Sequence, residues 1–257
     1  MLVLISDDGA NRDDSDEGRV ADYILGTGAT GTCIRDVSRA QGTGPHLQQH
    51  QLQKNHTPRT GAEKDTERLR GLFEGLKFDV RCYKNMTYQD MMTTLEQAGE
   101  EDHSNFDCFV CCVMSHGAQG KVFSSDEYPI EISLLLKPFN AKECPSLVGK
   151  PKLFFIQACQ GVHVQERVPV DCAFDANAVL HVSQEADFFV GLPTVPGCVA
   201  RRDDDGAPYI YHLTNVFKEF GDTYDLLTMM TMVANKMDQR GVSSNHSTLR
   251  KSVYFNP

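Results

Sequence analysis

Hydrophobic residues along the chain gather into short unbroken runs, separated by stretches with helical spacing. Three runs have the length of a buried strand: FDCFVCCVMSH at 106–116, KLFFIQA at 152–158 and DFFVGLPTV at 187–195. Unbroken apolar runs are typical of parallel strands covered on both faces, whereas half-exposed strands alternate apolar and polar residues. The runs therefore predict a parallel sheet between two layers of helices.

Other elements are expected around these runs. Helical patterns lie at 62–76, about 87–100, 211–220 and 224–237, and strand patterns lie at 77–83 and 249–255. Thr87, with Asp90 three residues later, predicts a capping box at the start of the second helix. The alternation of elements predicts an α/β sandwich with a mostly parallel sheet and helices on both faces.

Residues 1 to about 56 have a different composition, rich in Asp, Gly, Gln, Thr and His and poor in large apolar side chains. Such a segment buries too little surface to offset the entropy lost on ordering, so most of it is expected to be disordered or divergent. Residues 57–257 then form the folded domain. Within it, 161–186 is polar and long for a connection, which indicates a functional or cleaved loop.

The net charge of the chain limits the kinds of partner that it is expected to bind. The chain has 25 basic and 35 acidic residues, a formal net charge of −10 that repels nucleic acid and anionic lipid. No apolar run approaches the roughly 18 residues needed to span a bilayer, and the N-terminus lacks the basic flank of a signal peptide. A cytoplasmic protein without nucleic acid or membrane partners is expected.

The nine cysteines are odd in number, which fits a reduced compartment better than a disulfide framework. Cys108, Cys111 and Cys112 raise the alternative of a zinc site. Strand geometry places Cys108 and Cys111 on opposite faces, and no second Cys/His pair lies at ligand spacing. Packing as small hydrophobic side chains is favoured, and no metal is expected.

Two of the apolar runs end in residues that can carry chemistry. The first ends in Ser115-His116-Gly117 and the second in QACQG, with Cys159 at its centre. The carboxyl ends of parallel strands line the ligand crevice of an open sheet, so His116 and Cys159 are expected to face each other there. A neighbouring imidazole can accept a thiol proton and later protonate a leaving amine. The backbone amides of Gly117 and Cys159 are candidate oxyanion donors.

Either residue alone has a structural alternative, since a lone cysteine at a strand end is usually a packing residue. The two signatures together favour catalysis. QACQG, with a histidine upstream, is a caspase-type nucleophile signature. The words DHSNFDCFVCCVMSHG, CPSLVGKPKLFFIQACQG, EADFFVG and TLRKSVYF resemble the death-receptor initiator caspases, caspase eight and caspase ten. The resemblance runs from about Pro58 to the C-terminus.

The resemblance implies a caspase-like fold and a cysteine endopeptidase that cleaves after aspartate in apoptotic signalling, without a cofactor. Carried over residue by residue, its aspartate pocket uses Arg59 of RTGAEKD, Gln157 and Arg202 of PGCVARRDD. Ala200 stands where the family commonly has Ser and where the substrate is contacted through the backbone. Two guanidiniums can bind one carboxylate bidentately, which agrees with this pocket.

The family's mature form is a large and a small subunit, cut in the connection between them and paired with a second copy. Here this implies a large-subunit part at about 57–171 and a small-subunit part at about 187–257. Asp171 and Asp175 are the candidate self-cleavage sites, with Asp175 preferred. Protein substrates with aspartate at the cut site, and a homodimer or a caspase heterodimer, are the implied partners.

Some features depart from the family pattern. The stretch GTCIRDVSRAQG stands where a first core strand is expected, so that strand is predicted to be missing or degraded. The chain has no Trp, and its first 56 residues are too short and too polar to supply death effector domains. The alternative function is therefore a catalytically impaired homologue that regulates a true caspase by heterodimerisation. A related Cys/His protease with basic specificity is disfavoured, because Arg59 and Arg202 would repel a basic side chain.

Overall fold

The computed structural model describes residues 2–7, 23–24, 29–33, 61–163, 186–198, 200, 204–237 and 241–255. A seven-stranded sheet runs through the middle of these residues. In spatial order, its strands are β13 (Ser244–Ser247), β11 (Phe188–Leu192), β9 (Lys152–Gln157), β5 (Phe109–Met114), β1 (Leu2–Asp7), β3 (Ala29–Cys33) and β4 (Asp79–Tyr83). The central strands β5, β9 and β11 are parallel, as their unbroken apolar sequences predicted. Antiparallel strands β13 and β1 flank this core.

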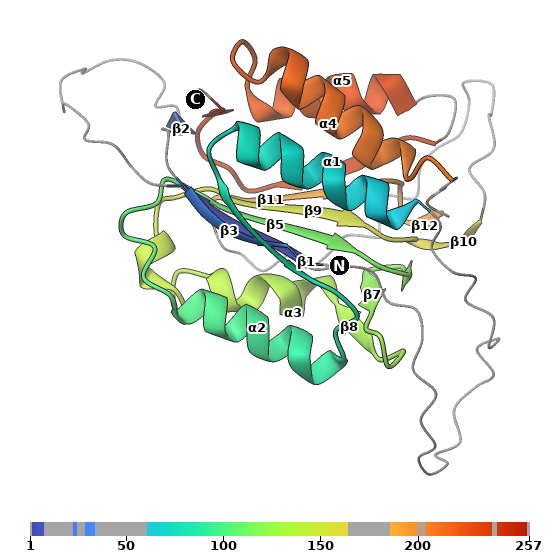
Figure 1. Ribbon diagram of the computed structural model, residues 1–257, viewed down its shortest axis with the longest axis horizontal. Coiled ribbons are helices and arrows are strands. Elements are labelled where there is room, and N and C mark those ends of the chain that lie inside the picture. Colours follow the sequence, from blue (N-terminus) through green and yellow to red (C-terminus); the bar gives the residue numbers. More distant parts are fainter. Residues whose placement is uncertain are drawn as a thin grey trace.

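Helices cover both faces of the sheet. The α-helices of the described residues are α1 (Ala62–Gly75), α2 (Tyr88–Glu100), α3 (Ile132–Leu136), α4 (Pro208–Phe220) and α5 (Leu226–Met237), with 3-10 turns η1 (Lys137–Phe139) and η2 (Pro145–Leu147). Helices α1, α4 and α5 lie on one face, and α2 and α3 lie on the other (Figure 1). The predicted α/β sandwich with a mostly parallel central sheet is therefore confirmed. Within the described residues, no helix is long and apolar enough to cross a membrane.

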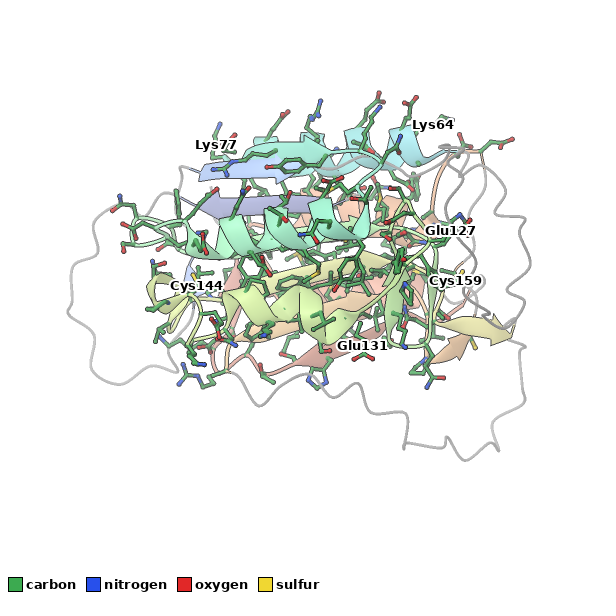
Figure 2. All side chains as sticks on the ribbon, turned by 90° about the horizontal axis from the view of Figure 1, so that it is seen from below. Lys64, Lys77, Glu127, Glu131, Cys144 and Cys159 are labelled. Atoms are coloured by element: carbon green, nitrogen blue, oxygen red, sulfur yellow. The ribbon has the colours of Figure 1, made fainter. Side chains whose placement is uncertain are left out.

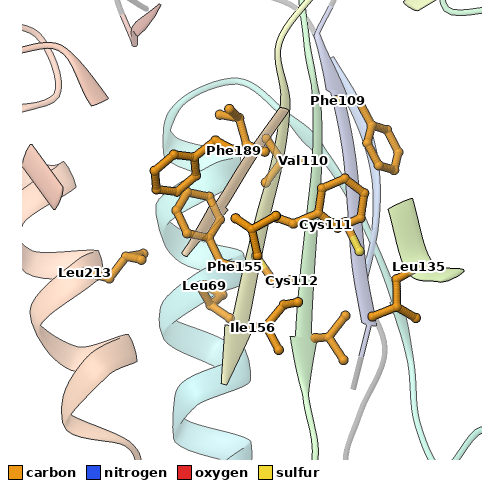
Figure 3. Close-up of a cluster of buried hydrophobic side chains, with 14 of the residues drawn as sticks. Leu69, Phe109, Val110, Cys111, Cys112, Leu135, Phe155, Ile156, Phe189 and Leu213 are labelled. Carbon is orange, nitrogen blue, oxygen red and sulfur yellow. The ribbon is translucent and has the colours of Figure 1, made fainter. Parts of the chain in front are cut away.

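The core lies between β9 and the helices on each side of it. Phe154 and Phe155 are consecutive, so their side chains point to opposite faces of the sheet. The Phe154 ring packs against that of Phe139 at a centroid distance of 5.8 Å, and the Phe155 ring packs against that of Phe217 at 5.9 Å. Figure 3 shows the same division, with Leu213 on the side of Phe155 and Leu135 on the opposite side. The long apolar run of β9 thus has two faces to fill.

The capping box predicted for the second helix is confirmed. Thr87 is the N-cap of α2, and its hydroxyl accepts a hydrogen bond from the Asp90 amide at 3.2 Å. The Asp90 carboxylate accepts in return from the Thr87 amide at 3.4 Å. These two bonds satisfy amides that have no partner within the helix.

The expectation of a missing first strand is wrong. Strand β1, from the apolar start of the chain, lies between β5 and β3, and its Val3 pairs with Cys82 of β4. Part of GTCIRDVSRAQG also belongs to the sheet, since β3 ends at Cys33. The expected strand therefore comes from a run some distance upstream of Arg59, which local sequence did not connect to the sheet. The domain boundary at residue 57 stays a prediction.

The C-terminal run is also placed differently from its prediction. Only Val253–Tyr254 is a strand, β14, and it pairs with β2 (Tyr23–Ile24) outside the main sheet. The last strand of the main sheet is β13, with the polar sequence SNHS. A polar edge strand carries no apolar alternation, so only its backbone pairing with β11 reveals it.

One cysteine departs from the prediction of free thiols. Cys82 on β4 is disulfide-bonded, and the register of β3 and β4 places Cys33 opposite it. The free cysteines among the described side chains are Cys108, Cys111, Cys112, Cys144, Cys159 and Cys198.

Candidate active site

His116 and Cys159 lie just beyond the ends of two adjacent parallel strands. In the register of β5 and β9, Met114 pairs with Gln157, so each candidate follows its paired residue by two positions. The pairing continues one residue further, because the Ser115 amide donates to the Gln157 carbonyl at 3.1 Å. The histidine and the cysteine therefore start their loops from the same edge of the sheet.

A short hairpin follows the histidine and lies directly against the cysteine backbone. It consists of β6 (Gly117–Ala118) and β7 (Lys121–Phe123), with β8 (Pro129–Glu131) beside it. A Cβ atom at Gly117 would lie 2.7 Å from the Cys159 carbonyl oxygen and 2.6 Å from the Lys121 carbonyl oxygen. Such contacts are too short for a side chain, so glycine is required for this approach.

On its other side, the Cys159 loop pairs with a segment that follows the third apolar strand. Strand β10 (Gly161–His163) is parallel to β12 (Gly197–Cys198). The partly exposed Cys159 thiol donates to the Ala200 carbonyl oxygen, with the two atoms 3.8 Å apart. Figure 2 shows Cys159 at this end of the molecule, with Cys144 at the opposite end. A reactive thiol here would have the histidine hairpin on one side and the Ala200 segment on the other.

Comparison with known protein families shows which family has this sequence pattern. The family model described as the caspase domain, a peptidase family, matches residues 48–254. The chain belongs to the caspase family. Caspases are cysteine peptidases, so the part of the chain with Cys159 and His116 lies within a protease domain.

Several individual caspases have comparable sequence identity with this chain. Mouse caspase-8 is 35% identical over 96% of this chain, chicken caspase-7 is 37% identical over 68%, and human caspase-10 is 39% identical over 71%. The chain spans 55%, 59% and 36% of those proteins, respectively. The resemblance to caspase eight and caspase ten is thus confirmed, although caspase-7 is nearly as similar. Because the mouse caspase-8 match covers 96% of this chain, it also extends upstream of Pro58.

The candidate aspartate pocket is described only in part. Gln157 at the end of β9 is 2% exposed, and its buried amide oxygen has no hydrogen-bond partner among the described residues. Buried amide oxygens are usually paired, so this one is open to a donor such as a guanidinium or a water molecule. Ala200 lies beside Cys159. Arg59 and Arg202 lie outside the described residues, and their roles stay predictions.

The candidate cleavage sites Asp171 and Asp175 also lie outside the described residues. The described chain stops at His163 and resumes at Ala186. Asp187 is 1% exposed, and Arg250 binds its carboxylate with two hydrogen bonds, of 3.0 and 2.6 Å. The chain is therefore anchored where the described residues resume, at the start of the predicted small-subunit part.

The cysteines of the CFVCC cluster differ from Cys159 in their surroundings. Cys111 and Cys112 are 0% exposed, and burial raises the pKa of both thiols above the ordinary value. A raised pKa keeps these thiols protonated and unreactive. In the described residues, no three His, Cys, Asp or Glu side chains form a group that could hold a metal ion.

Two buried residues of the site motifs received no role from the sequence. Asp65, the last residue of RTGAEKD, is 0% exposed, and both of its carboxylate oxygens lie 3.0 Å from the Ala207 amide nitrogen. Gln160 is 1% exposed and lies next to Cys159. The sequence indicated a role for Asp65 and Gln160 only through their positions inside the RTGAEKD and QACQG motifs. Their hydrogen-bond partners are too distant in sequence to be predicted.

Proposed function

We propose that this caspase-family chain is a cysteine endopeptidase that cleaves proteins after aspartate in apoptotic signalling. The observation that carries the proposal is the shared strand register of His116 and Cys159. Gly117, packed on the Cys159 backbone, brings the histidine hairpin against the cysteine. This arrangement supports a thiol and an imidazole that act on one bound peptide.

In the proposed mechanism, His116 accepts the Cys159 thiol proton and the sulfur attacks the scissile carbonyl carbon. The amides of Gly117 and Cys159 stabilise the negative oxygen that forms. The C–N bond then breaks, and His116 returns the proton to the leaving amine. Water hydrolyses the resulting thioester, which releases a carboxylic acid and restores the thiol.

Aspartate selectivity is assigned to Arg59, Gln157 and Arg202, with Ala200 contacting the substrate backbone. The unpaired oxygen of Gln157 supports this assignment, because it can accept from a pocket guanidinium and so orient it. Two guanidiniums without an anion would repel each other, which favours an acidic side chain and excludes a basic one. Cleavage at Asp175, or at Asp171, would produce the two-chain form.

A second copy of the chain is the proposed partner for the active form. Strand β13 is the last strand at one side of the main sheet in the described residues. Edge strands present unpaired backbone groups that can join the sheet of another molecule. The alternative of an impaired homologue that only regulates another caspase loses its main support, because β1 fills the place of the strand that was expected to be missing.

Turnover of fluorogenic tetrapeptides tests the proposal. We expect the wild type to hydrolyse a peptide ending in Asp and to leave its Glu and Lys counterparts almost uncut. Cys159→Ser should lower kcat by about 10³-fold or more, because the nucleophile is lost. Cys144→Ser is the matched control, since Cys144 lies at the opposite end of the molecule (Figure 2).

The outcomes separate the two functions. Folded, dimeric wild type without turnover would contradict the enzyme assignment and favour the regulatory one. Expression of the wild type and of Cys159→Ser in cells tests the apoptotic role, which predicts cell death only with the wild type. The masses of the self-cleaved products identify the cut at Asp171 or Asp175.

A further inference from the structure

Gln160, the residue after Cys159, is a buried polar side chain with contacts on two sides of the candidate site. It is 1% exposed, whereas Cys159 before it is partly exposed. A buried amide must find hydrogen-bond partners, so its position is set by whatever supplies them. Its partners come from two segments that are distant in sequence.

The backbone of Gln160 bonds to the segment that leads to Ala200. Its amide donates to the Cys198 carbonyl at 2.9 Å, and its carbonyl accepts from the Gly197 amide at 2.6 Å. The contact is very close, since a Cβ atom at the next residue, Gly161, would clash with the Gly197 backbone. The main chain at Gln160 therefore holds the Cys159 loop against β12.

The side chain of Gln160 reaches in the other direction, to the hairpin that follows His116. Its amide oxygen accepts from the Gly120 amide at 3.0 Å, across 40 residues of sequence. Gly120 forms the turn between β6 and β7 at a φ of 71°. The side-chain nitrogen also donates to the Ala158 carbonyl at 3.5 Å, which orients the amide group.

We propose that Gln160 is a positioning residue that holds the His116 hairpin and the Ala200 segment in register on either side of Cys159. The inference rests on the proposed protease function and deepens it. Gly117 touches the Cys159 backbone but has no side chain to hold the hairpin there. The Gln160–Gly120 hydrogen bond is a side-chain link that opposes movement of the hairpin away from Cys159.

The variant Gln160→Met tests the proposal, because methionine has a similar length and lacks the amide. A small displacement of reacting groups costs a large factor in rate, so we expect kcat to fall by about 10- to 100-fold. The KM for the Asp peptide should stay within about twofold, because the pocket residues are unchanged. Gln160→Glu keeps an acceptor for the Gly120 amide and should recover most of the lost kcat. Gln89→Met, at an exposed position on α2, is the matched control.

Hydrogen exchange of peptides that contain Gly120 provides a readout that needs no activity. Gln160→Met should speed exchange at the β6–β7 turn, and Gln160→Glu should restore the protection. An unchanged kcat and unchanged exchange in Gln160→Met would overturn the proposal. A fall of kcat that Gln160→Glu does not reverse would overturn it too.

Inactive wild type, in contrast, would contradict the proposed protease function alone. The exchange measurement then still decides whether Gln160 holds the hairpin. A similar melting temperature for Gln160→Met and Gln89→Met shows that the effect is local. A large loss of melting temperature, with kcat and KM changed together, would assign Gln160 to stability only and overturn the positioning role.

Discussion

His103 is a buried imidazole near the C-terminal end of α2. It is 1% exposed, and its Nε2 lies 2.8 Å from the Ala98 carbonyl oxygen. Its Nδ1 is also buried, and no residue in the described part of the chain forms a hydrogen bond with it. Protonation would place a donor and a charge where neither is satisfied. Burial accordingly lowers the pKa of His103, despite the opposing effect of the Ala98 bond.

The lowered pKa predicts that acid weakens the fold. Below the ordinary histidine pKa of about 6.5, the unfolded chain binds a proton that the folded chain does not. The free energy of unfolding therefore decreases as the pH is lowered. We expect the melting temperature to drop more steeply from pH 7.5 to 5.5 in the wild type than in His103→Gln. His212→Gln is the comparison for histidine loss elsewhere. Equal slopes in the wild type and His103→Gln would show that His103 does not contribute.

Residue identity alone does not distinguish a reactive cysteine from a packing one. Cys112 and Cys159 both lie in or after an apolar strand, yet only Cys159 is partly exposed and followed by a loop with partners on two sides. In the sequence, the glycine and polar residues around Cys159 distinguish it from a packing cysteine such as Cys112. They mark the end of the apolar run, where a side chain can meet a substrate.

At the scale of secondary-structure elements, the Asp65 side chain links helix α1 to the N-terminus of α4. Its carboxylate accepts from the Ala207 amide, just before α4 begins, and Arg68 lies 3.4 Å away from the same carboxylate. Gly206 permits this contact at a φ of 107°, since a Cβ atom there would clash with the Asp65 carboxylate. The bond links residues 142 positions apart, on opposite sides of the predicted cut.

Removal of this carboxylate should destabilise the domain. Asp65→Ala leaves the buried Ala207 amide without its acceptor, a loss of about 1–3 kcal/mol in the free energy of unfolding. Asp65→Asn keeps an acceptor and should lose less. Asp205→Asn, at an exposed side chain, is the control and should change the value by under about 0.5 kcal/mol. Chemical denaturation of the three variants measures the order. Equal stability of Asp65→Ala and the wild type would contradict this role.

Across the whole molecule, the predicted large-subunit and small-subunit parts share one core. Strand β9 from the first part pairs in parallel with β11 from the second, with Lys152 opposite Phe188. Phe188 and Phe189 of β11 are at most 1% exposed. Each fully buried side chain of this kind contributes about 1.5–3 kcal/mol relative to its exposed form. Separation of the two parts would expose all of this surface.

A cut in the connection should therefore leave the two parts bound to each other. A site for an unrelated protease inserted between Asp171 and Asp175 allows the cut in a Cys159→Ser background, without self-cleavage. After cleavage, we expect two chains on a denaturing gel and one complex of both in native mass spectrometry. Free small-subunit fragment under native conditions would contradict the shared core. The uncut protein, with the same insertion, is the control.

The sequence determined the elements whose pattern is local. The apolar runs at 106–116, 152–158 and 187–195 predicted the central strands, because a strand covered on both faces needs apolar residues at every position. Thr87 and Asp90 predicted a helix start through contacts three residues apart. The words around His116 and Cys159 predicted the family, since each motif lies within one strand end.

The tertiary structure decided what depends on backbone pairing or on distant partners. Strand β13 is polar, and β1 is distant in sequence from β4 and β5, with which it pairs. The position of neither strand in the sheet can therefore be predicted from hydrophobic periodicity. Asp65 and Gln160 were unassigned because their hydrogen-bond partners are brought near only when the sheet and its loops assemble. A buried polar group takes its role from the partner that satisfies it, and for these two residues that partner is chosen by the fold.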